Sequence, residues 1–184
     1  MSRRVVITGL GAVTPVGVGT KDFWHALRQG VSGIDIITRF DASSYACRVA
    51  AEVKDFEPRD FMSSKAAATT GRFTQLGVAA ARMAYEDAGL ASVPRASRFP
   101  VCFASSTNAV PEFQKAIQQF AAEGVPGLSP SVVVESIGSA VTNHIAIELG
   151  LTGQTMTLAS GCGSGLDVIQ WGCEQVQLRR VAGV

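Results

Sequence analysis

Apolar and polar residues alternate in short blocks along the chain, and these blocks predict strands and helices in turn. Short apolar or β-branched runs, typical of buried strands, occupy residues 4–8, 99–105 and 155–160. Apolar residues at helical spacing occupy residues 20–30, 73–88, 111–122 and 135–149, and a further helix follows residue 162. Such alternation favours an α/β fold in which helices cover a mostly parallel sheet.

Single residues mark where several of these elements begin and end. Thr20 is expected to cap the first helix and Gly30 to end it, and Gly89 to end the helix over residues 73–88. Residues 35–56 are expected to be irregular with short extended pieces, and residues 181–184 to begin another strand. No repeat or linker divides residues 1–184, which are therefore expected to form one structural unit.

One cysteine lies at a junction between a predicted strand and a predicted helix. The sequence T-M-T-L-A-S-G-C-G-S-G at residues 155–165 places Cys162 on a glycine-rich turn. Unpaired N–H groups and the positive end of the helix dipole favour a thiolate there over a thiol. The small neighbours allow a substrate carbonyl to approach, and the backbone N–H of Cys162 could serve an oxyanion hole. Cys162 is therefore the candidate nucleophile.

The other cysteines have a simpler interpretation. Cys47, Cys102 and Cys173 are interpreted as structural, because a free cysteine commonly behaves as a small buried apolar residue. No C-x-x-C pair occurs, and the spacings fit neither a metal site nor a disulfide framework. Four cysteines without a pattern are typical of a reducing compartment, and we expect a cytoplasmic location.

The composition excludes some classes of binding partner but does not indicate which reaction the chain catalyses. The chain has 184 residues, is 47% hydrophobic and carries a formal net charge of +1, which suits a globular core of ordinary size. Its basic residues are dispersed, so neither nucleic acid nor a membrane surface is expected as a partner. No apolar run approaches the ~20 residues that a membrane-spanning helix needs.

Several motifs together resemble a known enzyme family. They are V-V-I-T-G-L-G-A-V-T-P-V-G at residues 5–17, A-R-M-A-Y-E-D-A-G-L at 81–90, H-I-A-I-E-L-G-L-T-G at 144–153 and the Cys162 turn. Their order and spacing are similar to the N-terminal half of a β-ketoacyl-[acyl-carrier-protein] synthase, which has the thiolase-like fold. The resemblance implies that Cys162 accepts an acyl group from the phosphopantetheine thiol of an acyl carrier protein. Malonyl-carrier would then decarboxylate and condense with that group, without a further cofactor or metal.

The resemblance also implies what this chain needs from elsewhere. In the family, the nucleophile works with two histidines of the second half, in motifs that have no match here. His25 is interpreted as structural, and His144 as a packing residue or a helix–helix hydrogen-bond partner. We therefore expect a complementary C-terminal half or partner chain, in a homodimer or a heterodimer.

Some positions depart from the family pattern and affect specificity. The loop at residues 105–111 puts Thr107 and Asn108 where the family shapes or gates the acyl pocket. Residues 63–72 keep Lys65 and Arg72 for docking an acidic carrier protein, with alanines where relatives are more basic. Gly138 and Ser139 also stand where proline and asparagine are expected. These differences favour a specialised synthase, in either fatty-acid or polyketide synthesis.

Three other classes remain as alternatives. A non-catalytic partner resembling a chain-length factor would explain the missing histidines, although such partners normally lack the cysteine. A dinucleotide-binding protein is suggested by G-L-G-A-V-T and by Asp35, but Thr14 replaces the third glycine and Pro15 follows it. A cysteine hydrolase is disfavoured because its histidine base should follow the nucleophile, and His144 precedes it.

Overall fold

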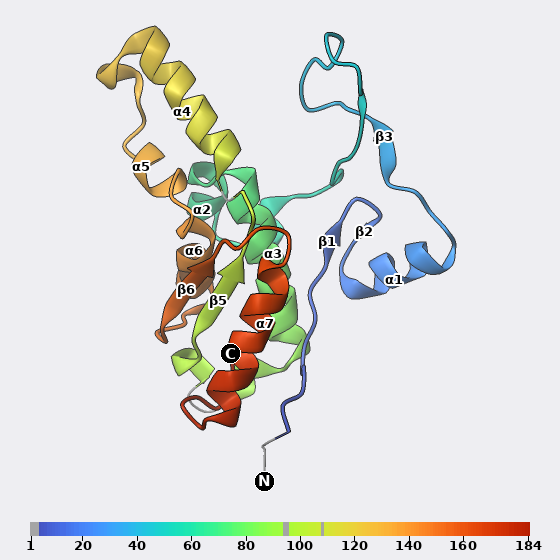
Figure 1. The fold of residues 1–184 in the computed structure, drawn as a ribbon, viewed down its shortest axis with the longest axis vertical. Helices are drawn as coiled ribbons and strands as arrows, with labels where there is room; N and C mark the ends of the chain where they lie inside the picture. The colour runs from blue at the N-terminus through green and yellow to red at the C-terminus, as the bar shows by residue number, and fades with distance from the viewer. Residues whose placement is uncertain (1–3, 94–95, 108) are drawn as a thin grey trace.

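The structure is a computed structural model that describes residues 4–93, 96–107 and 109–184. Its centre is a pair of parallel strands, β5 (Val101–Ala104) and β6 (Thr155–Leu158), with Val101 opposite Thr155 and Ala104 opposite Leu158. Helix α6 (Ala140–Leu149) and helix α7 (Ser164–Gln177) both pack against this pair. The α/β class, with parallel strands covered by helices, is confirmed (Figure 1).

The core lies where α3 (Arg72–Asp87), α6 and β5 meet, beside the short helix α2 (Ser64–Thr69). Val78 of α3 and Val141 of α6 are almost completely buried, with exposed fractions of 1% and 0%. Gly77 of α3 faces Val141 so closely that a Cβ atom there would collide with the valine side chain. The small residues of α3 thus let the two helices approach each other.

Two antiparallel pairs lie outside this body. The first joins β1 (Val13–Thr14) to β2 (Gly17–Val18) and leads into α1 (Thr20–Arg28). The second joins β3 (Ile34–Ile36) to β4 (Val49–Ala51) within a long loop that projects from the body in Figure 1. The expectation of short extended pieces within residues 35–56 is therefore confirmed.

Helix α4 (Val110–Glu123) and the single turn α5 (Val132–Glu135) project at the upper left of Figure 1, across from the β3–β4 loop at the upper right. The predicted helices over residues 73–88 and 111–122 are thus confirmed, as are the strands within residues 99–105 and 155–160. Gly30 and Gly89 follow α1 and α3 with φ angles of +66° and +64°, which only glycine adopts easily. Both glycines end their helices as expected.

The sequence-based boundaries were wrong at two other helix ends. Thr20 does not cap α1: it is the first helical residue, and Gly19 precedes it as an N-cap that makes no side-chain hydrogen bond. Residues 135–149 do not form one helix, because α5 ends at Glu135 and α6 begins at Ala140. Gly138 lies in the break, where its low helix propensity favours a turn.

Two predicted strands are absent from the residues described. Residues 4–8 pair with no strand, and Val6 and Ile7 have exposed fractions of 62% and 72%. The segment instead continues along α3, where the Leu10 N–H donates to the Asp87 carboxylate at 2.9 Å. Residues 181–184 also pair with no strand, and Gly183 packs against the Phe99 ring instead. An apolar run becomes a strand only where a neighbouring strand accepts its hydrogen bonds.

Candidate functional site

The turn that carries Cys162 connects the end of β6 to the start of α7. Gly161 has a φ angle of +86°, so the chain reverses at a residue without a side chain. The Ser164 N–H donates to the Gly161 carbonyl at 3.1 Å, and the Leu166 N–H donates to the Gly163 carbonyl at 2.9 Å. Ser164 is buried, with 4% of its surface exposed. The predicted strand–turn–helix setting of Cys162 is confirmed.

Cys162 combines an exposed position with an unpaired backbone donor. The residue is exposed and its thiol is free. Within the described residues, the N–H groups of Cys162 and Gly163 donate no hydrogen bond. A carbonyl oxygen placed beside Sγ would therefore meet an open N–H donor, as an oxyanion hole requires.

The other three cysteines differ from Cys162 in setting. Cys102 is half-buried in β5, and this burial raises the pKa of its thiol. Cys173 is half-buried on α7. Cys47 is exposed in the β3–β4 loop, where its thiol donates to the Val49 carbonyl at 3.6 Å. Cys162 is the one of the four that lies in the turn directly before a helix, two residues ahead of Ser164.

The loop of Thr107 leaves the same edge of the parallel pair as the Cys162 turn. Parallel strands bring their carboxyl ends together, and the Ser105 N–H donates to the Leu158 carbonyl at 3.2 Å. Thr107 is exposed in that loop. Asn108, the other predicted pocket residue, lies outside the described residues.

The two predicted docking residues have different surroundings. Lys65 is exposed on α2, and its ammonium group has no ion-pair partner among the described residues. Arg72 is half-buried at the start of α3, where its guanidinium donates to the Val53 carbonyl at 2.6 Å and lies 5.2 Å above the Phe56 ring. Partial burial lowers the pKa of Arg72. Of the two, Lys65 presents its charge to solvent.

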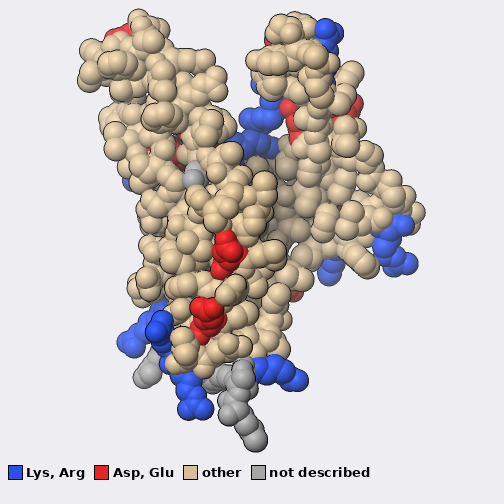
Figure 2. Space-filling model, viewed as in Figure 1, with Lys and Arg blue, Asp and Glu red and all other residues tan. Residues whose placement is uncertain are grey.

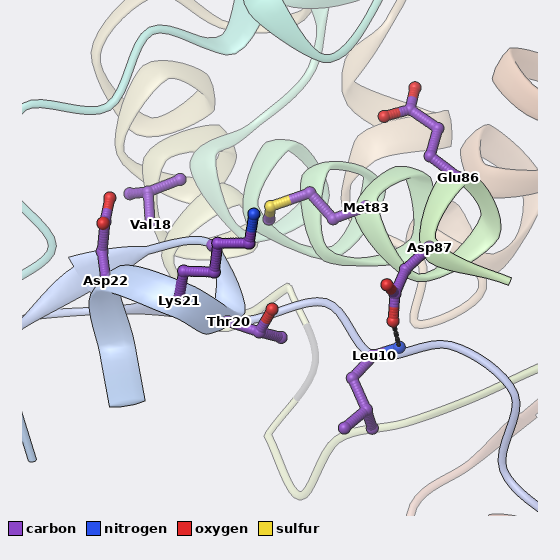
Figure 3. Close-up of a pocket in the computed structure, with 9 residues that line it drawn as sticks. Leu10, Val18, Thr20, Lys21, Asp22, Met83, Glu86 and Asp87 are labelled. Carbon is purple, nitrogen blue, oxygen red and sulfur yellow. Dashed lines mark hydrogen bonds between the residues drawn. The ribbon is translucent and has the colours of Figure 1, made fainter. Parts of the chain in front are cut away.

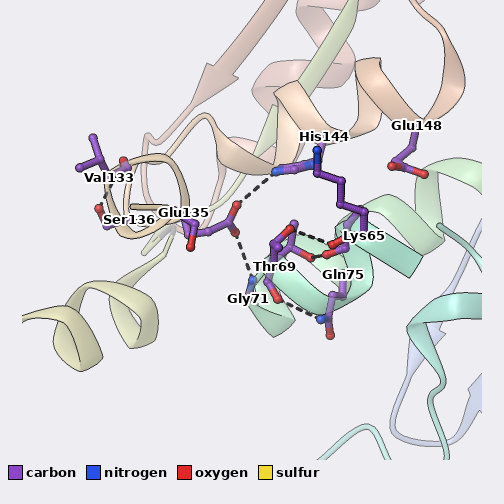
Figure 4. A network of polar contacts seen from close by, with 12 residues as sticks. Lys65, Thr69, Gly71, Gln75, Val133, Glu135, Ser136, His144 and Glu148 are labelled. Carbon is purple, nitrogen blue, oxygen red and sulfur yellow. Dashed lines mark hydrogen bonds and ion pairs between the residues drawn. The ribbon is translucent and has the colours of Figure 1, made fainter. Parts of the chain in front are cut away.

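His144 belongs to a buried polar network rather than to the Cys162 turn (Figure 4). Its Nε2 atom lies 3.1 Å from Oε1 of Glu135, and Oε2 of Glu135 accepts the Gly71 N–H at 3.1 Å. The predicted helix–helix hydrogen bond of His144 is confirmed. Sequence reasoning missed Glu135, although a lone acid at the end of V-V-V-E, nine residues before a histidine, was the available signal.

Two hollows in the surface lie away from the predicted site residues. The larger, about 510 Å³, lies between α1 and α3 and is lined by Leu10, Lys21, Met83, Glu86 and Asp87 among others (Figure 3). The other, about 330 Å³, is an apolar groove between α4 and α5. The surface over α4 and α5 is almost free of charged side chains in the view of Figure 2.

The described part of the chain holds no cluster of metal ligands and no helix suited to a membrane span. No three histidine, cysteine or acidic side chains there gather as metal ligands. None of its helices combines the length and apolarity that a bilayer span requires.

A family model described as "Beta-ketoacyl synthase, N-terminal domain" matches residues 2–183. The chain belongs to the β-ketoacyl synthase family. It is 37% identical over 165 residues to 3-oxoacyl-[acyl-carrier-protein] synthase 2 of Coxiella burnetii, covering 89% of this chain and 40% of that protein. It is 36% identical over 169 residues to the protein of the same name from Staphylococcus aureus strain COL, covering 91% and 41%. The chain thus spans about two-fifths of the length of these relatives.

Solved ketosynthase structures have the same fold. The ishigamide ketosynthase/chain length factor aligns with a TM-score of 0.89 and 30% identity, over 98% of this chain and 46% of that one. A β-ketoacyl synthase from Burkholderia phymatum aligns with a TM-score of 0.80 and 23% identity, over 97% and 44%. These alignments confirm the thiolase-like fold expected from the motifs.

Proposed function

We propose that this chain supplies the acyl-accepting part of a β-ketoacyl-[acyl-carrier-protein] synthase. The supporting observation is the position of Cys162, exposed on a glycine turn between β6 and α7 with an open backbone donor. The Cys162 sulfur attacks the carbonyl of an acyl thioester, and the carbonyl–sulfur bond to the carrier's phosphopantetheine breaks. Malonyl-carrier then loses carbon dioxide, and its carbanion attacks the acyl carbon on Cys162, whose bond to the cysteine sulfur breaks and releases the thiolate.

The acid–base groups of the condensation come from outside this segment. His144 is held by Glu135, and His25 lies on α1, which is far from α7 in Figure 1. Near Cys162, Leu166 and Ile169 expose 74% and 54% of their surfaces. Apolar surface beside a nucleophile is suited to being covered by a further protein segment. We assign that cover to a complementary C-terminal half or partner chain, within a homodimer or heterodimer.

An acidic acyl carrier protein is the proposed donor. Lys65 offers an exposed positive charge on α2, whereas the guanidinium of Arg72 is already engaged by Val53 and Phe56. We therefore give Lys65 the larger part in docking and Arg72 the smaller. Thr107 lies in the loop beside the Cys162 turn, and Thr107 and Asn108 are together proposed to shape the acyl pocket. The four free thiols suit a reducing, cytoplasmic compartment.

A non-catalytic partner subunit is the second candidate. One observation favours it, namely the TM-score of 0.89 with a ketosynthase/chain length factor structure. The exposed Cys162 favours the catalytic role, because a subunit that only shapes a pocket needs no nucleophile there. The two functions make opposite predictions for acylation.

The test is acylation by octanoyl-carrier, followed by mass mapping of the modified residue. Cys162→Ala is expected to abolish acylation, whereas the control Cys173→Ala, on the same helix, should retain it. Cys162→Gln should still decarboxylate malonyl-carrier when the second half is present, because decarboxylation does not use the thiolate. Acylation that persists in Cys162→Ala would place the nucleophile elsewhere. A parent chain that is never acylated, even when assembled with its complementary half, would favour the partner-subunit function.

A further inference from the structure

Ser160 and Asp167 lie on the two sides of the Cys162 turn and are joined by a hydrogen bond. Ser160 lies between the end of β6 and Gly161, and Asp167 lies in the first turn of α7. The Ser160 hydroxyl donates to Oδ2 of Asp167. This bond therefore spans the candidate nucleophile, from the strand side of the turn to the helix side.

The turn needs such a bond because its own residues restrict it little. The N-cap of α7 is Gly163, which has no side chain to bind the helix N–H groups. Gly161 and Gly163 flank Cys162, and glycine is the residue least restricted in its backbone angles. Backbone hydrogen bonds close the helix side, where the Asp167 N–H donates to the Gly163 carbonyl at 3.3 Å. The Ser160 hydroxyl connects the strand side to that closed turn.

We propose that Asp167 is a positioning residue for Cys162, acting through the Ser160 hydroxyl. This inference rests on the proposed function of Cys162 as acyl acceptor. In acylation, Sγ of Cys162 bonds to the acyl carbon, the bond from that carbon to the donor sulfur breaks, and the Cys162 thiol proton passes to the departing thiolate. The attack requires Sγ and the Cys162 N–H to meet the same carbonyl group. The Asp167 carboxylate holds the turn that carries both.

The useful property of Asp167 is its acceptor oxygen and not its charge. A negative charge in the first turn of α7 competes with a Cys162 thiolate for the positive end of the helix. The charge alone therefore opposes acylation. Asparagine at this position would keep an acceptor oxygen on a side chain of the same length and would remove the charge.

The experiment measures two reactions at Cys162 in the same protein preparation. The first is acylation by the thioester octanoyl-N-acetylcysteamine, and the second is alkylation by iodoacetamide. Asp167→Ala and Ser160→Ala should each slow acylation about tenfold, and the double variant should be no slower. Asp167→Asn should stay within about threefold of the parent, because it still accepts from Ser160. Alkylation should change less than about threefold in every variant, because attack on a saturated carbon uses no oxyanion donor.

Three results would overturn the inference. The first is acylation of Asp167→Asn that is as slow as that of Asp167→Ala. The second is a double variant whose acylation slows by the product of the two single losses. The third is an alkylation rate that falls as far as the acylation rate. Urea unfolding of each variant separates loss of the fold from loss of positioning. Failure of the proposed function shows in the parent, which would not be acylated at Cys162. If this inference alone fails, the parent is still acylated at Cys162. The variants then either keep the parent's acylation rate or lose acylation and alkylation to the same extent.

Discussion

The carboxylate of Glu135 holds the ring of His144, with Oε1 3.1 Å from Nε2. Both side chains are largely buried, and the other oxygen of Glu135 accepts the Gly71 N–H at 3.1 Å. One acidic side chain therefore connects α5, α6 and the junction between α2 and α3 (Figure 4). This relationship accounts for His144 as a structural residue, since its ring is directed at Glu135.

Replacing Glu135 with alanine should destabilise the chain by about 2–4 kcal/mol. The loss arises because two buried donors, the Gly71 N–H and the His144 ring, would both lose their acceptor. Urea unfolding gives the free energy directly. Glu86→Ala is the matched control, because Glu86 is exposed and its ion pair with Arg82 is long, at 4.0 Å. This variant should lower the free energy of unfolding by less than about 0.5 kcal/mol. Equal effects of the two variants would contradict this account.

The parts of the fold that the sequence predicted well are those decided by local signals. Gly89 ends α3 at a positive φ that other residues avoid. The Cys162 turn was predictable because a strand pattern, a run of small residues around the cysteine and a helix pattern follow one another within residues 155–177. The residue pattern made Cys162 the candidate nucleophile, and the family resemblance added its expected role as acyl acceptor.

The parts that failed depend on partners distant in sequence. Residues 4–8 have the composition of a strand, yet a strand needs a neighbour, and the described residues offer them none. The contacts of Arg72 were likewise not visible in the sequence, because Val53 and Phe56 lie nineteen and sixteen positions away from it. The role of Glu135 was not predicted, because its two partners, His144 and Gly71, lie on other elements.

Cys162 should be the most reactive thiol of the chain. Limiting iodoacetamide at pH 7.5 should label it before Cys47, Cys102 and Cys173, as mass mapping would show. Cys47 is the informative competitor, because it is also exposed but lies in the β3–β4 loop and not directly before a helix. Faster labelling of Cys47 would contradict this prediction. It would show that the start of α7 does not increase the reactivity of Cys162.

Labelling of Cys102 should depend on pH in a defined direction. Burial raises the pKa of its thiol, so the reactive thiolate is scarcer at a given pH than in an ordinary exposed cysteine. Its labelling rate in the folded chain should therefore begin to rise at a higher pH than in the unfolded chain. A series of iodoacetamide reactions from pH 7 to about 10, with urea-unfolded chain as the reference, measures this. Coincident curves for folded and unfolded Cys102 would contradict the effect of burial.

Two glycine-to-alanine changes in helices should act in opposite directions. Gly77→Ala should destabilise by about 1–2 kcal/mol, because the new methyl group collides with Val141 across the α3–α6 contact. Gly172→Ala should stabilise by about 0.5–1 kcal/mol, because its nearest neighbours, atoms of Val184, lie at 3.6 Å. Both values come from urea unfolding. Stabilisation by both changes would mean that α3 and α6 are less tightly packed than described.

Lys65→Glu should weaken acylation by octanoyl-carrier without affecting acylation by octanoyl-N-acetylcysteamine. The small thioester reaches Cys162 without docking on α2, so only the carrier reaction depends on the charge of Lys65. Reversing one interfacial charge should lower the carrier rate about tenfold at low salt, and the difference should shrink as salt is added. Lys21→Glu is the control, because Lys21 is an exposed lysine on α1, in the hollow shown in Figure 3. Equal losses for Lys65→Glu and Lys21→Glu would mean that net charge attracts the carrier. Equal losses with both thioesters would mean that Lys65 affects the Cys162 site itself and not the docking of the carrier.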